Sequence, residues 1–333
     1  MINNLYMIYK NKRKCLVTGG AGFMGSHLVD KLIERGDRVV IIDNLSTGKK
    51  ENLNLKARFY KIDIRSPEIS EIFRKEKPEI VFHFAAQIDV RKSVENPIRD
   101  AKINILGSLN LIQNFVSANQ RSAQRKPTFP KKFIFASTGG AIYGDTDVIP
   151  TPENYPENPE SPYGICKLAI EKYLHFYKKT YGLNSVILRF ANVYGPRQNS
   201  KGEAGVIAIF CDKMLKNEEV IINGDGEQTR DFVFVDDVIN AALLAISGEQ
   251  FSGSSLAVYN IGTAKETSIN EIFRKIKELT NSNCKEIHGP AKPGEQKRSC
   301  LDYSKAKKEL NWQPEYDLEK GLKETINWFK NEN

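Results

Sequence analysis

The stretch CLVTGGAGFMG, residues 15–25, decides the fold, because a short apolar strand runs directly into a glycine-rich turn that opens a helix. Gly19 suits the tight turn, Gly22 lets backbone approach a pyrophosphate, and Gly25 lets helix and strand pack closely. The free N–H groups at the helix N-terminus attract phosphates. Ser26 stands where a P-loop would carry lysine. The stretch therefore predicts a dinucleotide-binding turn in preference to a purely structural one.

Short apolar runs alternate with stretches of helical periodicity through the first half of the chain. These runs lie at residues 15–17, 39–42, 59–62, 80–84, 133–135 and 186–188. Continuously apolar strands joined by crossover helices predict a parallel sheet covered on both faces. The predicted fold class is α/β, a doubly wound parallel sheet of the Rossmann type with a smaller mixed α/β C-terminal domain.

Domain boundaries follow from where this pattern loosens. We expect residues 1–190 to form the dinucleotide-binding Rossmann domain and residues 191–333 mainly the substrate-binding domain, with part of residues 232–261 returning to the first. The two longest helices should start near Pro97 and Pro162, since proline suits the first helical turn.

Composition limits the other function classes. The 333 residues are 40% hydrophobic, with five cysteines and four histidines, and neither set is spaced for a zinc site or a disulfide framework. We expect no metal and a reducing, cytoplasmic setting. The net charge of +8 is partly concentrated in residues 1–14, which resemble neither a signal peptide nor a membrane span and should be frayed, and in the stretch 121–132. Neither nucleic-acid nor membrane binding is expected.

Two carboxylates follow predicted strands. Asp43 ends the second strand, about 20 residues beyond the glycine turn, where a carboxylate accepts hydrogen bonds from the adenosine ribose and repels a 2′-phosphate. NAD is therefore expected in preference to NADP. Asp63 ends the third strand and either faces the adenine or is an ordinary surface carboxylate.

Tyr163 and Lys167 lie four residues apart at the start of a predicted helix, so they share one face. The ordinary pKa of a tyrosine is near 10, and a tyrosine that acts as a base near neutrality needs a pKa lower by about three, which corresponds to roughly 4 kcal/mol. A lysine ammonium and the positive nicotinamide ring can supply it. Ser137 and Thr138 follow the fifth strand, where a hydroxyl could bridge the tyrosine and a substrate.

Six further stretches complete the pattern. They are HFAAQ (83–87), NILGS (104–108), SPYGICK (161–167), RFANVYGPR (189–197), GDGEQTRDFVFVDD (224–237) and KPGEQKRSCLD (292–302). With the glycine turn and the tyrosine and lysine pair, they make the chain resemble the extended short-chain dehydrogenase/reductases over almost its whole length. Within that family it is most similar to the UDP-glucose 4-epimerases.

The resemblance implies roles for particular residues. Tyr163 would be the base, Lys167 would hold the NAD ribose and lower the tyrosine pKa, and Thr138, or else Ser137, would supply the hydroxyl. The implied NAD-binding residues are Gly19, Gly22, Phe23, Met24, Gly25, Asp43, Asn44, Asp63, Ile64, Phe84, Ala85, Ala86, Gln87, Asn104, Tyr163, Lys167 and Phe190. The implied substrate-binding residues are Thr138, Asn192, Val206, Arg230, Lys292, Arg298 and Ser299.

Two positions depart from the family pattern. Lys292 stands where relatives commonly carry arginine, which replaces a bidentate fork by a point charge next to the phosphates. Ser299 stands where some epimerases carry a bulky aromatic residue beside the sugar. A small residue leaves room for an N-acetyl group, so acetylated UDP-hexoses are expected to be accepted too.

The resemblance implies NAD-dependent 4-epimerisation of a UDP-hexose through a 4-keto intermediate, as in galactose metabolism, by a homodimer paired through the helices from Pro97 and Pro162. Three alternatives stay open. A 4,6-dehydratase would need an acidic pair where this chain has Gly139-Gly140-Ala141. A UDP-glucuronate 4-epimerase would share the same chemistry. A non-catalytic NAD-sensing protein is disfavoured because the tyrosine and lysine are retained.

Overall fold

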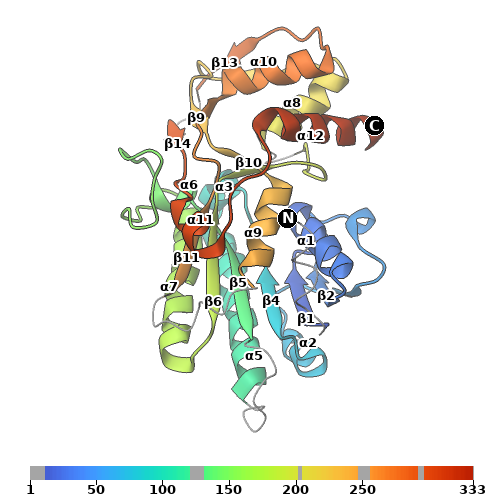
Figure 1. Cartoon of the computed structure of the whole chain (residues 1–333), viewed down its shortest axis with the longest axis vertical. Coiled ribbons are helices and arrows are strands. Elements are labelled where there is room, and N and C mark those ends of the chain that lie inside the picture. The colour runs from blue at the N-terminus through green and yellow to red at the C-terminus, as the bar shows by residue number, and fades with distance from the viewer. Residues whose placement is uncertain (1–11, 121–130, 202–204, 247–255, 292–295, 333) are drawn as a thin grey trace. The chain divides into compact units, whose positions relative to one another are not determined.

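The computed structural model describes residues 12–120, 131–201, 205–246, 256–291 and 296–332 (Figure 1). These described residues leave out most of the basic N-terminal stretch 1–14, most of the basic stretch 121–132, and Lys292. The chain forms two compact units. The first comprises Met1–Ala136, Ser161–Ile187 and Ala245–Ala257, and the second comprises Ser137–Glu160, Leu188–Leu244 and Val258–Asn333. Which unit binds which ligand stays a prediction.

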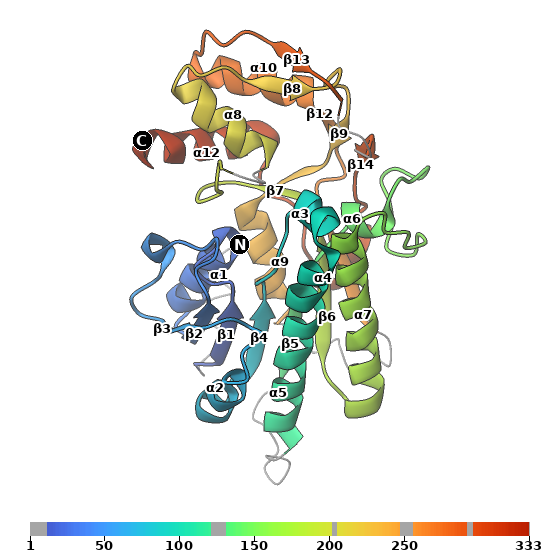
Figure 2. The same cartoon turned by 180° about the vertical axis from the view of Figure 1, so that it is seen from behind.

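A seven-stranded sheet has the strand order β11-β6-β5-β4-β1-β2-β3 (Figures 1 and 2). Its strands are β1 (Lys14–Thr18), β2 (Arg38–Asp43), β3 (Arg58–Lys61), β4 (Ile80–His83), β5 (Lys132–Thr138), β6 (Ser185–Phe190) and β11 (Ala257–Ile261). β1 pairs in parallel with β2 on one side and β4 on the other, β2 with β3, and β4 with β5. The strand order reverses at β1, and in such sheets the crevice beyond the strands' carboxyl ends binds ligands. The predicted α/β, doubly wound parallel fold is confirmed.

The turn after β1 has the geometry that its glycines predict. Gly19 has a φ of +72°, a backbone conformation that glycine adopts without strain. A Cβ on Gly25 would lie 2.1 Å from the carbonyl oxygen of Gly19, so no larger residue fits there. Helix α1 (Phe23–Glu34) begins directly after Gly22 and buries Leu28 and Leu32 among other apolar residues.

Both helices predicted to start at a proline do so. α7 (Pro162–Tyr181) has Pro162 in its first turn and Ser161 as its cap, and the Ser161 side chain accepts a hydrogen bond from the Gly164 N–H. α4 (Pro97–Ala101) is capped in the same way by Asn96 and continues through a π-helical segment, η3 (Lys102–Gly107), into α5 (Ser108–Gln120). α5 packs against α7, and the two helices run side by side in both views (Figures 1 and 2). No sequence signal indicated the π-helical segment.

The remaining elements of the first unit are η2 (Lys50–Asn52), α2 (Ile69–Glu76) and α3 (Val90–Glu95). The described part of the second unit holds three small sheets: β10 (Phe232–Phe234) with β7 (Asn192–Tyr194); β12 (Thr267–Ser268), β9 (Thr229–Arg230) and β14 (Arg298–Ser299); and β13 (Ile287–Gly289) with β8 (Ile221–Asn223). Its helices are α6 (Gly140–Tyr143), α8 (Val206–Leu215), α9 (Val235–Leu244), α10 (Ile269–Thr280), α11 (Ser304–Leu310) and α12 (Leu318–Glu332). α8 packs against both α10 and α12. Among the described helices, none is long and apolar enough to cross a membrane.

A directed chain of hydrogen bonds ties the end of β1 to β4 and α5. The Thr18 hydroxyl accepts from the Ala85 N–H at 3.2 Å and lies 2.8 Å from His83 Nδ1, while His83 Nε2 lies 2.7 Å from the Ser108 hydroxyl. Ser108 donates its proton to the Asn104 carbonyl at 2.6 Å. Since Ser108 donates to that carbonyl, it accepts from His83 Nε2, which leaves Nδ1 as the acceptor for Thr18. This series of hydrogen bonds, with Nδ1 as an acceptor, therefore requires a neutral His83 side chain.

Burial and the nearby Lys167 lower the pKa of His83 from 6.5 to about 3. Below pH 6.5 His83 binds a proton in the unfolded chain but stays neutral in the folded chain. The free energy of unfolding therefore falls as the pH falls. This loss should be about 2 kcal/mol at pH 5 relative to pH 7. We expect His83→Gln to flatten the pH dependence of the free energy of unfolding by that amount, measured by urea denaturation at both pH values.

The matched control is His175→Asn on α7, because the His175 side chain is exposed. That variant should keep the wild-type pH dependence. Equal pH slopes for wild type and His83→Gln would show that His83 is not held neutral in the fold.

Candidate functional site

The first part of the site is the strand end beside the glycine turn. Asp43 closes β2 with only 7% of its surface exposed. One carboxylate oxygen accepts from the Ala21 N–H at 3.0 Å, and the other accepts from the Leu45 N–H at 2.8 Å. A Cβ on Gly48 would approach both oxygens at 3.0 Å, so glycine keeps this edge of the carboxylate open. The structure thus places Asp43 in contact with the turn, as its position in the sequence predicts.

The turn itself fits a dinucleotide pyrophosphate. Gly19 and Gly25 occupy positions where a side chain would collide with backbone. No side chain caps the N-terminus of α1, so Phe23 and Met24 begin the helix without a side-chain acceptor for its first N–H groups. Anions bind at such helix ends through these N–H groups and the helix dipole. The residues present therefore suit the phosphates of NAD.

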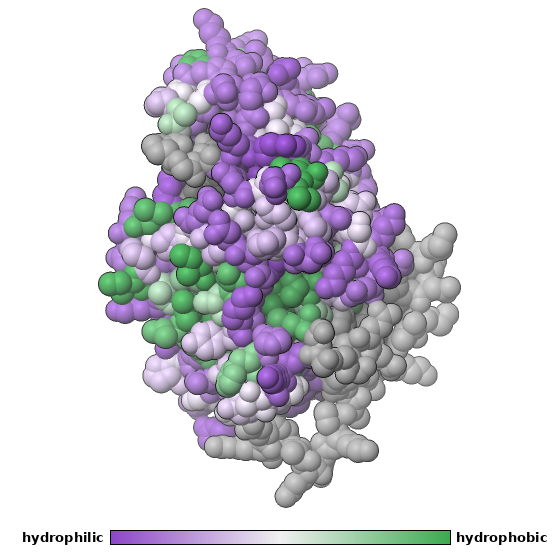
Figure 3. All heavy atoms as spheres, turned by 90° about the vertical axis from the view of Figure 1, so that its left-hand side faces the viewer, coloured by the Kyte–Doolittle hydropathy of each residue, from purple (hydrophilic) through white to green (hydrophobic). Residues whose placement is uncertain are grey.

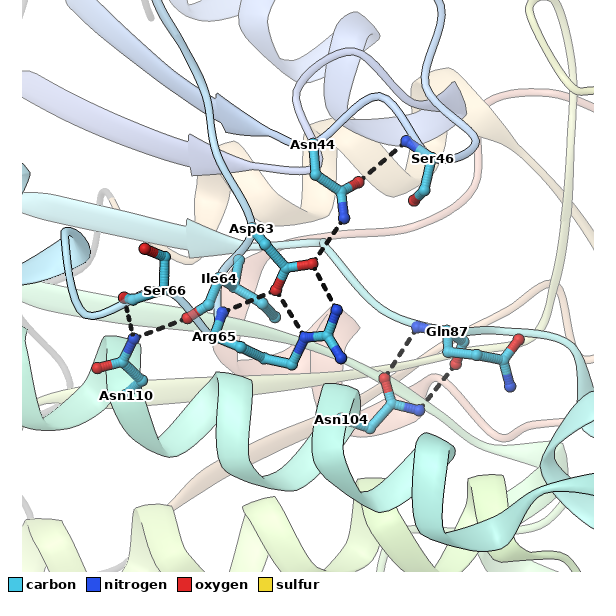
Figure 4. Close-up of polar contacts among 9 residues, drawn as sticks. All are labelled: Asn44, Ser46, Asp63, Ile64, Arg65, Ser66, Gln87, Asn104 and Asn110. Atoms are coloured by element: carbon cyan, nitrogen blue, oxygen red, sulfur yellow. Dashed lines mark hydrogen bonds and ion pairs between the residues drawn. The ribbon is translucent and has the colours of Figure 1, made fainter.

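The end of β3 carries a polar cluster that the sequence did not predict in full (Figure 4). Asp63 accepts from Asn44 Nδ2 at 2.8 Å and from two guanidinium nitrogens of Arg65, each at 2.8 Å. The hydrogen bond from Arg65 is the main cause that lowers the pKa of Asp63 to about 2. The buried Ile64 lies between Asp63 and Arg65 in the sequence, and the Asn110 side chain of α5 donates to the Ile64 carbonyl at 2.8 Å. Arg65 directly follows Asp63 and Ile64, and that proximity was the only available signal for it.

The loop after β4 runs beside the glycine turn. A Cβ on Gly19 would lie 2.8 Å from the Ala85 nitrogen, so turn and loop are in close contact. Gln87 exchanges two hydrogen bonds with Asn104: its N–H donates to Asn104 Oδ1 at 2.9 Å, and its carbonyl accepts from Asn104 Nδ2 at 2.8 Å (Figure 4). Asn104 is buried in the π-helical segment. The predicted residues 84–87 and Asn104 are thus joined to one another.

Tyr163 and Lys167 converge in the first turns of α7. Lys167 Nζ lies 5.8 Å from the centre of the Tyr163 ring and 4.9 Å from that of Phe135. The ammonium donates to the Ala136 carbonyl at 2.8 Å, and the lysine is only 5% exposed. The Tyr163 N–H donates to the Ser93 hydroxyl at 3.2 Å. The helix spacing therefore brings the two side chains together as predicted.

The electrostatics of this pair differ from the sequence expectation. Burial lowers the pKa of Lys167 to about 8, although Asp100 and Glu171 act to raise it. Burial, reinforced by Asp100, raises the pKa of Tyr163. The protein's own groups therefore favour the neutral phenol, because desolvation and the Asp100 charge both disfavour the phenolate. The expected lowering of the tyrosine pKa requires further positive charge.

Predicted residues also lie in the second unit. Ser137 is buried at the end of β5, whereas Thr138 is partly exposed and its hydroxyl lies 3.5 Å from the Ala141 N–H. β14 pairs with β9, which sets Ser299 opposite Arg230. The other predicted residues here are Phe190 at the end of β6, Asn192 at the start of β7 and Val206 at the start of α8. The prediction for Lys292 lies outside the described residues.

Arg298 has a partner that the sequence did not reveal. Its guanidinium forms an ion pair with Glu266, and Glu266 also accepts from the Thr229 hydroxyl. The ion pair lowers the pKa of Glu266 and raises that of Arg298. The predicted phosphate contact of Arg298 would therefore compete with an existing carboxylate partner. Glu266 is distant in sequence, so no local pattern indicated it.

The family of the chain follows from comparison with known proteins. The family model described as NAD dependent epimerase/dehydratase family matches residues 15–262. The chain belongs to this family. The expected family resemblance is confirmed. Within the described residues, no group of three or more His, Cys, Asp or Glu side chains is arranged to hold a metal ion.

Three relatives are similar to this epimerase/dehydratase over nearly its whole length. A putative UDP-glucose 4-epimerase from Methanocaldococcus jannaschii is 49% identical, with 96% of this chain and 99% of the relative covered. The crystal structure of UDP-glucose 4-epimerase with UDP-glucose from Thermotoga maritima is 50% identical, with a TM-score of 0.90 and coverage of 96% and 99%. UDP-N-acetylglucosamine 4-epimerase from Methanobrevibacter ruminantium, in complex with UDP-N-acetylmuramic acid, is 35% identical, with a TM-score of 0.88 and coverage of 97% and 100%.

Proposed function

We propose that this protein is an NAD-dependent UDP-hexose 4-epimerase that interconverts UDP-glucose and UDP-galactose. The observation that carries the proposal is the convergence of Tyr163 and Lys167, with the lysine anchored 2.8 Å from the Ala136 carbonyl. The near-complete similarity to UDP-glucose 4-epimerases supports it. Tyr163 would take the proton of the sugar 4-hydroxyl as hydride leaves C4, which gives a 4-keto sugar. Return of the hydride to the opposite face of C4, and of the proton to O4, completes the epimerisation.

Each polar group of the chain then has a separate task. Bound NAD supplies a reversible hydride acceptor and, when oxidised, a positive charge near the phenol. Lys167 would hold the NAD ribose and, with that charge, counter the burial that keeps Tyr163 protonated. Thr138 would bridge tyrosine and sugar in preference to Ser137, because Thr138 is partly exposed and Ser137 is buried.

The segment after Thr138 disfavours a 4,6-dehydratase. That reaction needs an additional acid and base, and Gly139, Gly140 and Ala141 provide neither. A Cβ on Gly139 would lie 2.5 Å from a Leu301 methyl carbon, and one on Gly140 would lie 2.9 Å from the Ser299 hydroxyl oxygen. Acidic side chains would therefore not fit at these glycines without rearrangement. The alternative of a UDP-glucuronate 4-epimerase is an outcome of the assay below.

Tyr163→Phe should lower kcat by about 10²- to 10⁴-fold, because it removes the proton acceptor and donor. The assay incubates the full chain with UDP-glucose, UDP-galactose or UDP-glucuronate, each deuterated at C4, without added NAD. We expect epimer formation from UDP-glucose and UDP-galactose with the deuterium retained in the product.

Tyr173→Phe is the matched control, because Tyr173 lies on the same helix and is 42% exposed. It should leave kcat unchanged. Undiminished turnover by Tyr163→Phe would contradict the proposal, as would transfer of the label to NAD in a parallel assay to which NAD is added.

We also infer that acetylated UDP-hexoses are accepted. Ser299 is buried and its hydroxyl lies close to Gly140, so both residues at this point are small. The similarity to a UDP-N-acetylglucosamine 4-epimerase supports this wider specificity. A tyrosine in place of Ser299 would put a large side chain where the small residue is inferred to admit the N-acetyl group.

Ser299→Tyr should therefore lower the ratio of kcat/KM for UDP-N-acetylglucosamine to that for UDP-glucose by roughly 10-fold or more. Ser299→Ala, which keeps the space, should preserve the ratio. An unaltered ratio in Ser299→Tyr would show that Ser299 does not set this specificity.

The protein is inferred to act as a homodimer. Large apolar side chains are exposed along α3, α4, η3 and α7, which pack together. They are Val90, Val94, Ile98, Leu106, Ile165, Tyr173, Phe176 and Tyr181. Figure 3 shows hydrophobic side chains gathered on one face of the molecule. Apolar patches of this kind mark association surfaces, and a second copy of the chain is the partner that the family resemblance implies.

Ile98→Asp should weaken the dimer, because Ile98 is 68% exposed on α4 and a charge buried in the interface is costly. Sedimentation equilibrium should show a dimer of wild-type chains and a predominantly monomeric variant. Leu55→Asp is the control, since Leu55 is 99% exposed but lies outside these helices. A monomeric wild-type protein at micromolar concentration would contradict the inference.

The protein is also inferred to work in a reducing, cytoplasmic setting. Its five cysteines are free thiols, and all are buried. Buried thiols without disulfide partners suit a reducing compartment.

A further inference from the structure

Asp100 is a buried carboxylate that the proposed reaction does not use. It lies on α4 and is 1% exposed. One carboxylate oxygen, Oδ1, accepts from Gln87 Nε2 at 2.8 Å and from Asn104 Nδ2 at 3.0 Å. The other, Oδ2, is buried and has no hydrogen-bond partner among the described residues. A buried carboxylate of this kind is costly unless positive charge lies nearby.

Lys167 provides that charge. α4 and η3 both pack against α7, so Asp100 lies near the start of the helix that carries Tyr163, Cys166 and Lys167. Burial raises the pKa of Tyr163 and of Cys166 and lowers that of Lys167, and the negative charge of Asp100 acts to raise all three. Through this packing, Asp100 acts on both residues that are proposed to carry the reaction.

The other groups around Lys167 differ in whether they carry charge. β5 contributes the Ala136 carbonyl and the Phe135 ring, neither of which carries charge. β4 contributes His83, whose pKa of about 3 keeps it neutral. On α7 itself, Glu171 is the second carboxylate that acts on Lys167. Among the described carboxylates that act on Lys167, Asp100 is therefore the one on a different helix.

We propose that Asp100 is a positioning residue whose buried carboxylate keeps Lys167 charged and, through Asn104 and Gln87, fixes the loop after β4. The proposal extends the proposed function of Tyr163 and Lys167, but the charge state of Lys167 is measurable without any substrate. Its physical basis is the balance between desolvation, which favours the neutral amine, and an anion in the same dry region, which favours the ammonium.

The balance is close enough for one charge to matter. Burial already brings the pKa of Lys167 to about 8, although Asp100 acts against it. Without Asp100, a larger share of Lys167 would lose its proton near neutral pH. The same loss of negative charge would make Tyr163 more acidic, so both groups would titrate at lower pH.

Asp100→Asn removes the charge and keeps the shape. The amide oxygen of asparagine can accept the two bonds that Oδ1 accepts now, and its NH₂ group would take the place of Oδ2, which has no hydrogen-bond partner among the described residues. Asp89→Asn is the matched control, because Asp89 is also a buried carboxylate and caps α3, where asparagine is an equally good cap.

The first measurement is an NMR titration of the full chain labelled with ¹³C at lysine Cε, with the Lys167 signal assigned through Lys167→Met. We expect the Lys167 pKa to fall by about one unit or more in Asp100→Asn and to stay at the wild-type value in Asp89→Asn. Should Asp100→Asn fail to fold by circular dichroism, Asp100→Thr serves instead, since threonine also removes the charge and retains a hydroxyl acceptor.

The second measurement is the pH profile of kcat for UDP-glucose, whose two limbs should both move to lower pH in Asp100→Asn only. An unchanged Lys167 titration in the uncharged variants would overturn the proposal, as would a lower kcat with both limbs unmoved, which indicates a merely structural role. A shifted Lys167 titration in a protein that turns over no UDP-sugar would support the role of Asp100 and refute the epimerase function separately.

Discussion

The contact on which the site depends is the 2.8 Å hydrogen bond from Lys167 Nζ to the Ala136 carbonyl. It joins the second turn of α7 to the end of β5, in a region with almost no solvent. Pro162 with its Ser161 cap starts α7 about one turn before Lys167. Because Tyr163 lies one turn earlier on the same face, the position of the phenol follows from the anchored lysine.

Burial makes the charged form of Lys167 unfavourable. A buried ammonium beside a neutral carbonyl loses hydration that the carbonyl only partly replaces. The region responds in two ways: Asp100 and Glu171 supply negative charge, and His83 stays neutral. The same desolvation and the same Asp100 charge raise the pKa of Tyr163. The phenol of Tyr163 therefore stays protonated until further positive charge is placed beside it. Proton transfer by Tyr163 thus depends on whether the site holds such a charge.

The sequence predicted those features that local rules determine. The glycine turn, the alternating strands and the tyrosine and lysine spacing each follow from short-range steric or periodic constraints, as in the turn around Gly19. Features that depend on tertiary packing were not predictable. Asp100 lies four residues before Asn104, which indicates a shared helix face but not that the carboxylate is buried against α7. Glu266 likewise meets Arg298 only because β9 and β14 are neighbours.

The series of hydrogen bonds through His83 joins the loop after β4 to the π-helical segment η3, so these two segments must be ordered together. It runs from the Ala85 N–H beside the glycine turn to the Asn104 carbonyl in the π-helical segment. Asn104 also bonds Gln87 and Asp100 through its amide. A change in the protonation of His83 would reverse one bond of this chain and place a second cation near Lys167. The neutral histidine therefore preserves both the geometry of the loop after β4 and the balance of charge around Lys167.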